Sequence, residues 1–184
     1  SKDRIEVISN ALSRFFSNAT IAVGHDIDGA VMATCAGEPG FACILGTGSN
    51  AVLFDGQKII YPKGFLGIGY ILGDEGSGSF MGKQLLRDFL YKRLPEEIEN
   101  HLSQEMGLDK DKILNAVYKT PNANKYLASF AQVLNMFNDT PYVKELVKNS
   151  FDAFLKYNIA SFPEYKTYKV NFVGSIALHF QVTL

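Results

Sequence analysis

The strongest constraint on the fold of this chain is an apolar run that ends abruptly in a glycine-rich turn. Residues 41–45 read FACIL, and residues 46–50 read GTGSN. A short, continuous apolar run bounded by turn residues predicts a buried strand. A strand that ends in such a turn presents several backbone N–H groups to one point, and this geometry binds anions. The sequence therefore predicts a phosphate-binding loop directly after a buried strand.

A second glycine-rich stretch, GDEGSG at residues 73–78, adds acidic side chains to the picture. Asp74 and Glu75 lie between its glycines. Backbone donors for phosphate beside carboxylates are typical of phosphoryl transfer, in which a metal ion shares the charge. The two stretches together predict a protein that handles a phosphorylated ligand.

The apolar periodicity predicts an α/β fold with a mixed sheet. Asp55 and Gly56 signal a hairpin between two strands, so part of the sheet is antiparallel. Short strands interleaved with helices are typical of α/β proteins. The expected strands are 21–24, 41–45, 51–54, 58–61 and 168–173; the expected helices are 4–16, 28–35, one that runs to residue 90 and is capped by Ser77 or Ser79, several within 95–160, and one opened by Gly174 and Ser175.

Composition excludes several functional classes. The chain has 184 residues and a formal net charge of -1, which gives no electrostatic case for nucleic acid or membrane binding. No apolar run reaches the length of a membrane span. Cys35 and Cys43 have neither zinc-site nor CxxC spacing, and free thiols fit a reducing compartment. We therefore expect a cytoplasmic protein with no protein-held metal, and the residues leave the oligomeric state open, with a homodimer among the alternatives.

Two common nucleotide motifs do not account for these glycines. Residues 46–51 formally match the dinucleotide fingerprint GxGxxA, but that fingerprint must open a helix. The residues that follow predict a hairpin instead. A Walker A loop is also absent, because residues 81–84 lack the upstream glycine and the hydroxyl residue. A phosphate loop between two antiparallel strands remains.

Four motifs in order resemble those of one known family. They are ILGTGSN at 44–50, GIG at 67–69, GDEGS at 73–77 and VGSIA at 173–177. In these motifs the chain resembles the N-acetylglucosamine kinase and BadF/BcrA-type ATPase family, from about residue 19 to 180. That family belongs to the sugar kinase, Hsp70 and actin superfamily.

The resemblance implies a ribonuclease H-like, actin-type ATPase domain with a mixed sheet and an inserted helical block over residues 79–160. On this basis residues 1–37 are expected to be a remnant of a first ATPase domain, and residues 38–184 a second one. The family's first phosphate loop has no counterpart in the sequence, so we expect a fragment that is inactive alone.

The resemblance also assigns a nucleotide site. It implies that Thr47 and Gly48 hold the phosphates of ATP, with the bound Mg²⁺ ion sharing the charge. It further implies that Gly174 and Ser175 pack on the adenosine. Ala128 is the nearest match to an alanine that lines the nucleotide in this family.

The substrate site implied by the resemblance involves a different set of residues. The family places a sugar at its Gly-Trp-Gly motif and at the aspartate of GDEG. The matching positions are Gly67, Ile68, Gly69 and Asp74. Ile68 stands where the family has an aromatic residue.

Asp26 is the expected catalytic base. The resemblance implies a catalytic aspartate after a short strand, about twenty residues before the phosphate loop; Asp26 matches, and Asp28 is the second candidate. The chemistry agrees, because a hydroxyl that attacks phosphorus needs a carboxylate to orient it and accept its proton. Asp26 could instead cap the helix that follows.

The resulting functional hypothesis is ATP-dependent phosphorylation of a hydroxyl of an amino sugar such as N-acetylglucosamine. The first alternative is a BadF/BcrA-type ATPase that activates a partner enzyme through an iron–sulfur cluster. The second is a nucleotide-binding fragment without turnover. Exposed cysteine thiolates would favour the cluster, whereas Cys43 lies inside an apolar run.

Overall fold

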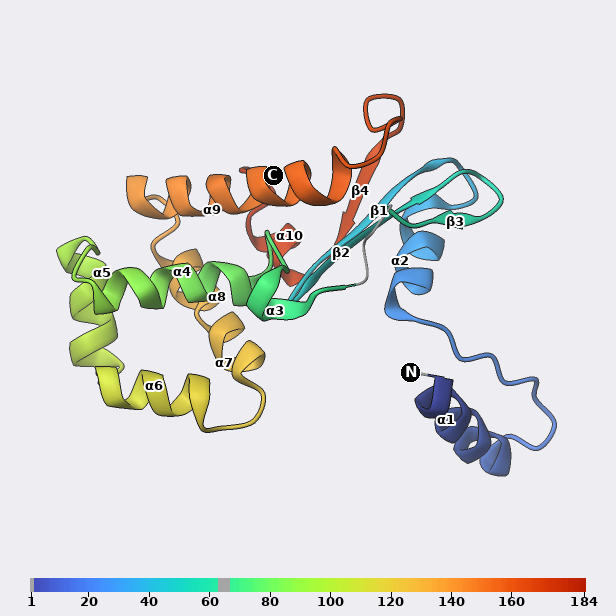
Figure 1. The fold of residues 1–184 in the computed structure, drawn as a ribbon, viewed down its shortest axis with the longest axis horizontal. Helices are drawn as coiled ribbons and strands as arrows, with labels where there is room; N and C mark the ends of the chain where they lie inside the picture. Colours follow the sequence, from blue (N-terminus) through green and yellow to red (C-terminus); the bar gives the residue numbers. More distant parts are fainter. Residues whose placement is uncertain (1, 63–66) are drawn as a thin grey trace.

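The computed structural model describes residues 2–62 and 67–184. A four-stranded mixed sheet lies at the centre of the fold, with helices beside it (Figure 1). The strand order is β3-β2-β1-β4. β1 pairs antiparallel with β2 and parallel with β4, and β2 pairs antiparallel with β3, so the expected mixed sheet is confirmed. The strands are β1 (Gly40–Leu45), β2 (Ser49–Phe54), β3 (Ile59–Ile60) and β4 (Val170–Val173).

Both faces of this sheet are covered, and β1 is therefore apolar throughout. On one face, Ala42 and Val52 pack against helix α2 (Asp26–Cys35). On the other face, Phe41 meets Phe162 edge-on, with ring centroids 5.1 Å apart. A strand that is buried on both faces reads as a continuous apolar run, which explains the sequence of residues 41–45.

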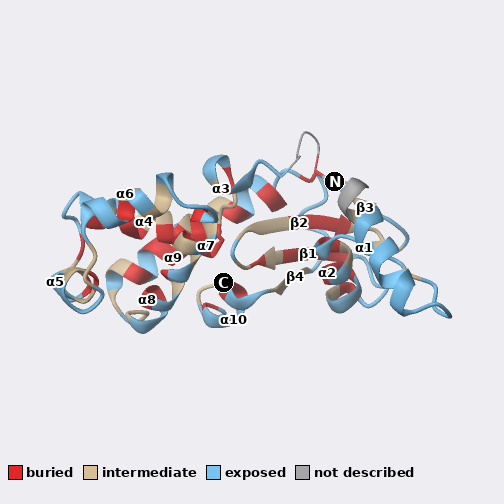
Figure 2. Ribbon diagram, turned by 90° about the horizontal axis from the view of Figure 1, so that it is seen from below, coloured by how far each residue is buried: buried red, intermediate tan, exposed pale blue. Residues whose placement is uncertain are grey.

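The helical block expected over residues 79–160 is confirmed, and its core is continuous with one face of the sheet (Figure 2). Ser77, Asp109 and Thr140 cap three of its helices by accepting hydrogen bonds from backbone N–H groups. Its members are α4 (Gly78–Leu90), α5 (Glu96–Asn100), α6 (Lys110–Tyr118), α7 (Ala123–Ser129), α8 (Ala131–Met136) and α9 (Pro141–Phe154), with π-helical turns η1 (His101–Glu105) and η2 (Leu155–Ile159).

Helices α4 and α7 approach each other closely at Gly82. A Cβ atom on Gly82 would lie 1.9 Å from the carbonyl oxygen of Leu127. The absence of a side chain therefore lets the two backbones touch. This contact sets the distance between α4, which begins beside the predicted phosphate loop, and the helix that carries Ala128.

The N-terminal part of the chain differs from one expectation. Helix α1 (Lys2–Phe15) confirms the helix expected over 4–16 and stands away from the sheet in Figure 1. The strand expected at residues 21–24 is wrong, because this segment pairs with no strand in the described part of the chain and runs as irregular backbone into α2. A strand needs a neighbour to satisfy its backbone groups, and no strand of the described sheet pairs with this segment.

Helix α3 (Gly69–Leu72), a single turn, was not expected from the sequence, whereas α10 (Ser175–His179) follows β4 as expected. No helix within residues 2–62 and 67–184 is long and apolar enough to cross a membrane.

We predict that Gly82→Ala destabilises the fold, because the added methyl must push α4 and α7 apart. Overpacking of this kind costs about 1–3 kcal/mol. Gly29→Ala is the matched control, since Gly29 also lies in a helix but has no atom within 4 Å of an added Cβ. That change should be neutral or stabilising by up to about 1 kcal/mol. Urea unfolding of both variants tests the claim, and equal stabilities would contradict it.

Candidate active site

The turn between β1 and β2 is attached to the first residues of α4. Within the turn, the Gly46 N–H donates to the carbonyl oxygen of Gly48 at 3.0 Å. The Gly78 N–H donates to the Gly46 carbonyl at 2.8 Å, and the Ser79 N–H donates to the Thr47 carbonyl at 3.1 Å. The loop carbonyls thus satisfy N–H groups at the start of α4 that a helix leaves without partners. The side chain of Thr47 is exposed and free to contact a ligand.

Two serines fix the start of α4 from inside. The Ser77 hydroxyl accepts a hydrogen bond from the Phe80 N–H at 3.2 Å and lies 3.0 Å from the Ser79 hydroxyl. Both serines are fully buried. A buried, fully paired polar cluster resists rearrangement, so the helix start is a rigid support for the loop.

Asp74 lies against the same loop in a strained backbone conformation. Its φ of 57° is in the left-handed region, which few residues other than glycine adopt. A Cβ atom on Gly48 would lie 2.9 Å from Oδ2 of Asp74, so the carboxylate occupies the space that a side chain at position 48 would fill. Strained residues that persist in a structure cluster at functional sites.

The half-buried carboxylate of Asp74 has opposing influences on its pKa. Burial raises the pKa of Asp74, and the neighbouring charge of Glu75 raises it further. A hydrogen bond from the Ser49 backbone N–H and the positive charge of Lys83 act in the opposite direction and lower it. The net result is a pKa above the ordinary value of an aspartate.

The segment from Gly67 to Gly73 forms a compact turn beside Asp74. Gly67 and Gly69 have φ values of 61° and 74°, which favour glycine. The Gly73 N–H donates to the Gly69 carbonyl at 2.8 Å. Ile68 folds back over Gly73, where an added Cβ would lie 2.6 Å from its Cγ1 atom. Ile68 is itself exposed, so it is available to a ligand.

The end of β4 comes close to the end of β1 at Gly174. Gly174 has a φ of 112°, and a Cβ atom there would lie 2.2 Å from the carbonyl oxygen of Leu45. Only glycine permits this approach. Ser175 follows as the first residue of α10 and is exposed.

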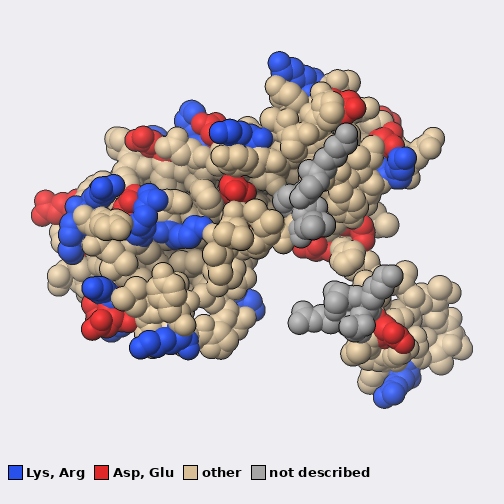
Figure 3. Space-filling model, in the orientation of Figure 1, with Lys and Arg blue, Asp and Glu red and all other residues tan. Residues whose placement is uncertain are grey.

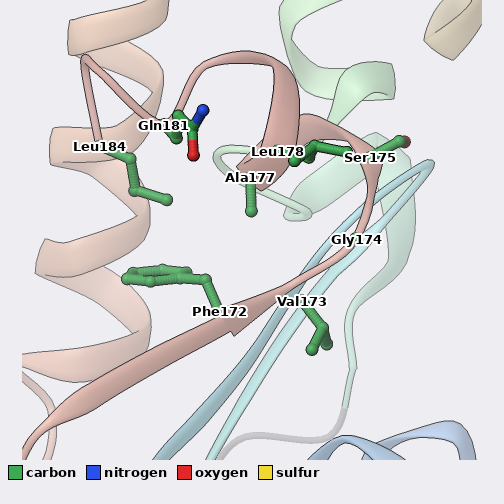
Figure 4. Close-up of a pocket in the computed structure, with 8 residues that line it drawn as sticks. All are labelled: Phe172, Val173, Gly174, Ser175, Ala177, Leu178, Gln181 and Leu184. Atoms are coloured by element: carbon green, nitrogen blue, oxygen red, sulfur yellow. The ribbon is translucent and has the colours of Figure 1, made fainter. Parts of the chain in front are cut away.

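A pocket of about 630 Å³ opens beside Gly174 and Ser175. In Figure 4 the side chain of Phe172 lies on one side of it and α10 on the other. Its lining residues are Phe172, Val173, Gly174, Ser175, Ala177, Leu178, Gln181 and Leu184.

Ala128 connects these parts. A Cβ atom on Gly78 would lie 3.3 Å from the Cβ of Ala128 and 3.3 Å from Cδ1 of Ile176. Ala128 in α7, Gly78 in α4 and Ile176 in α10 therefore meet at the start of α4. Ala128 is only partly buried, so part of its surface remains open.

Asp26 is the exposed first residue of α2. Its Oδ1 atom accepts a hydrogen bond from the Ile27 N–H at 2.9 Å. Asp28 has a capping role instead, because its Oδ2 atom accepts a hydrogen bond from the His25 N–H at 2.8 Å. In Figures 1 and 2, α2 lies beside the sheet and apart from the tip where β1 turns into β2. Each of the two candidate bases accepts one backbone hydrogen bond, and Asp26 is the more exposed of the two.

A solved structure from Porphyromonas gingivalis, named "putative N-acetylglucosamine kinase", is 38% identical to this chain and superposes with a TM-score of 0.88. The match covers 96% of this chain and 62% of that one. This chain belongs to the N-acetylglucosamine kinase family. It spans about 62% of the length of that relative.

A second structure of the same name, from Chromobacterium violaceum, supports the fold. It has 21% sequence identity and a TM-score of 0.68, covering 94% of this chain and 62% of its own. At that identity the likeness concerns the fold alone. No protein-family model matches the sequence. No curated protein matches it either.

The structure of this N-acetylglucosamine kinase family member brings together most of the site residues that were expected from the sequence. Thr47, Gly48, Asp74, Ala128 and Gly174 surround the start of α4. The pocket in Figure 4 contains Gly174 and Ser175 but none of the other expected site residues. Asp26 makes no hydrogen bond to the loop among the described residues.

Sequence reasoning about this family member missed one charged residue. Lys83, on α4, donates from Nζ to the carbonyls of Tyr70 at 3.2 Å and Ile71 at 3.4 Å, and its charge acts on Asp74. Nothing in its sequence context distinguishes it from a surface lysine. Across the described ranges, no group of three or more His, Cys, Asp or Glu side chains could hold a metal ion.

We predict that Gly48→Ala shifts the pKa of Asp74, because the added methyl displaces the carboxylate from its half-buried position beside the Ser49 N–H. Both burial and this N–H act on the pKa of Asp74, so moving the carboxylate changes both influences. Gly46→Ala is the matched control in the same loop, since an added Cβ there meets no atom within 4 Å. Titration of the carboxyl carbon of Asp74 by NMR measures both variants. A pKa that stays unchanged in Gly48→Ala would show that the two residues are not in contact.

Proposed function

We propose that this chain forms the nucleotide-binding part of a kinase that uses ATP to phosphorylate a hydroxyl group of an amino sugar such as N-acetylglucosamine. The observation that carries the proposal is the convergence of the Gly46–Ser49 loop, Asp74, Ala128 and Gly174 at the start of α4. The 38% identity to a structure of that name supports the same reaction class. The proposal includes the ribonuclease H-like, actin-type ATPase fold.

The loop is suited to the phosphates of ATP. The Thr47 hydroxyl is exposed, and the backbone N–H groups of Thr47 and Gly48 lie at the tip of the turn, where an anion could accept hydrogen bonds from them. Because the loop carbonyls are turned toward α4, the N–H groups remain for the ligand. Gly174, Ser175 and Ala128 would contact the nucleoside part. Mg²⁺ would come with the phosphates and neutralise their charge, as is usual for this ion.

The sugar would bind between the turn of Gly67–Gly69 and Asp74. Ionised carboxylates accept hydrogen bonds from hydroxyl groups, and Asp74 is held close to the phosphate loop. Ile68 offers an exposed apolar surface on the same side. This arrangement would place a sugar hydroxyl near the terminal phosphate.

Asp26 would orient the attacking hydroxyl and accept its proton. Its carboxylate is exposed and accepts only a hydrogen bond from its neighbour among those described. Asp28 is less exposed than Asp26, and its carboxylate caps α2 through the His25 N–H. The start of a helix packed on the sheet is a rigid position for such a group.

The wider assignments are part of the same proposal. Residues 1–37 would belong to a first ATPase domain and residues 38–184 to a second, with the substrate bound between them. The partner is a small sugar, with neither nucleic acid nor membrane involved. On the face drawn in Figure 3, Lys and Arg side chains lie among Asp and Glu side chains. A homodimer fits the same scheme. Free thiols at Cys35 and Cys43 agree with a cytoplasmic location.

The alternative of a BadF/BcrA-type ATPase with an iron–sulfur cluster has less support. Cys35 and Cys43 are 4% and 0% exposed. Burial raises the pKa of the Cys43 thiol, with the nearby Cys35 adding to the effect. Cluster ligands must be accessible thiolates, and neither cysteine fits that role. Iron content of the purified protein would reveal a cluster directly.

We predict that Thr47→Ala weakens ATP binding while leaving the fold intact, because the hydroxyl faces the ligand and not the core. Loss of a hydrogen bond to a charged group costs about 1.5–3 kcal/mol, or about 10- to 100-fold in affinity. Thr47→Ser keeps the hydroxyl and should retain most of the affinity. Calorimetric titration with ATP and Mg²⁺ measures all three proteins, and an unchanged Thr47→Ala affinity would refute the assignment of the phosphate loop.

We predict that Asp26→Asn in the full-length natural protein loses about 10²–10⁴-fold in turnover and little ATP affinity, because asparagine cannot accept the proton. Asp28→Asn should keep most turnover, since an amide oxygen still accepts the capping hydrogen bond. Sugar-dependent ADP release across a panel of amino sugars tests the variants and the proposed reaction together. The reverse pattern would move the base to Asp28, and no release with any sugar would end the kinase proposal.

A further inference from the structure

Lys83 ties the short helix α3 to the helix that supports the phosphate loop. Its Nζ atom donates to the carbonyl oxygens of Tyr70 at 3.2 Å and Ile71 at 3.4 Å. Carbonyls in the last turn of a helix have no partner within that helix, and a lysine that reaches them acts as a cap. Lys83 lies in α4, two turns or less from the Gly78 N–H that binds the loop.

Helix α3 has few other attachments in the described part of the chain. It is a single turn, and its N-terminal residue Ile68 provides no side-chain cap. Ile71 and Leu72 are 69% and 75% exposed, and Tyr70 packs against the main core only in part. A helix this short is not stable on its own, so its position depends on external contacts. The two hydrogen bonds from Lys83 are therefore a substantial part of what holds it.

The same lysine also faces acidic groups. Burial lowers the pKa of Lys83, whereas the charges of Glu75 and Asp74 raise it. The charged groups that act on Asp74 are Glu75, on its own segment, and Lys83, on α4; the β1–β2 turn contributes the Ser49 N–H, which carries no net charge. Lys83 is thus the cation that offsets the repulsion between two adjacent carboxylates.

We propose that Lys83 is a positioning residue for the substrate: it holds the Gly67–Gly73 turn against α4 so that this turn and the Asp74 carboxylate face the same sugar. The proposal rests on the sugar kinase function proposed above. It differs from an ordinary surface role because the cation is partly buried and bonded to backbone carbonyls. Among the residues that the structure describes, Lys148 on α9, with a side chain that is 66% exposed, pairs with Asp152 one turn away and with no other acidic residue.

The test compares three variants. Lys83→Met removes the charge and the donors but keeps the length and most of the apolar stem. Lys83→Arg keeps a cation with several donors. Lys148→Met removes an exposed helical lysine and serves as the matched control.

Hydrogen exchange tests the attachment of α3 without reference to activity. In Lys83→Met the backbone amide of Gly73, which donates to the Gly69 carbonyl, should exchange about tenfold faster, because local opening becomes easier. Lys83→Arg and Lys148→Met should exchange as the natural protein does. Equal exchange in Lys83→Met would overturn the proposal.

Kinetics of the full-length natural protein test the effect on the substrate. Lys83→Met should raise KM for the sugar about 10- to 100-fold and leave KM for ATP within about twofold, since the proposal places the sugar, and not ATP, against this turn. The acid limb of kcat/KM for the sugar should move to higher pH, because loss of the cation raises the pKa of Asp74 and the ionised form then requires a higher pH. Lys83→Arg should restore both properties.

The outcomes separate the two proposals. Equal increases in both KM values, or a loss that arginine does not restore, would overturn the positioning role. If the natural protein phosphorylates no sugar, the proposed function fails and the substrate role of Lys83 fails with it, while faster exchange in Lys83→Met would still establish the attachment of α3.

Discussion

The attachment of the Gly46–Ser49 turn to the start of α4 is the contact on which the arrangement of the site depends. Two hydrogen bonds, from Gly78 and Ser79, connect the sheet to the helical block at this point. The turn alone would be a flexible hairpin connection, and α4 alone would begin with unsatisfied N–H groups. Their union fixes the loop relative to Asp74, to α7 and to α10. The positive end of the α4 dipole also lies directly behind the loop, which favours an anion in front of it.

Three close backbone contacts then bring distant segments to this point. Gly82 lets α4 touch α7, Gly174 lets β4 meet the last residue of β1, and Gly48 leaves room for the Asp74 carboxylate. At each position the nearest atoms belong to a segment remote in sequence. These three glycines therefore act mainly through the space that they leave open, and only Gly174 among them also has a positive φ.

The sequence predicted the elements of the fold well where local signals decide them. The run 41–45, the hairpin and the helical block follow from apolar periodicity and capping residues, whereas the strand expected at 21–24 failed because pairing partners are not visible in a sequence. The helix Gly69–Leu72 is too short to show a helical periodicity of apolar residues in the sequence. The hydrogen bonds that Lys83 donates to it are tertiary contacts, which a sequence does not reveal. The roles of the site residues came from family resemblance, and they remain predictions, although the structure gathers most of them around one helix start.

The contact between Gly48 and Asp74 has a consequence for how the sequence can change over evolutionary time. A mutation at position 48 to any other residue places an atom where the carboxylate lies, so the Asp74 side chain must shift or residue 74 must become smaller. A change at residue 74 must also suit a left-handed backbone, which favours glycine or asparagine. The two positions therefore restrict each other, and homologous sequences should show them either both retained or both replaced.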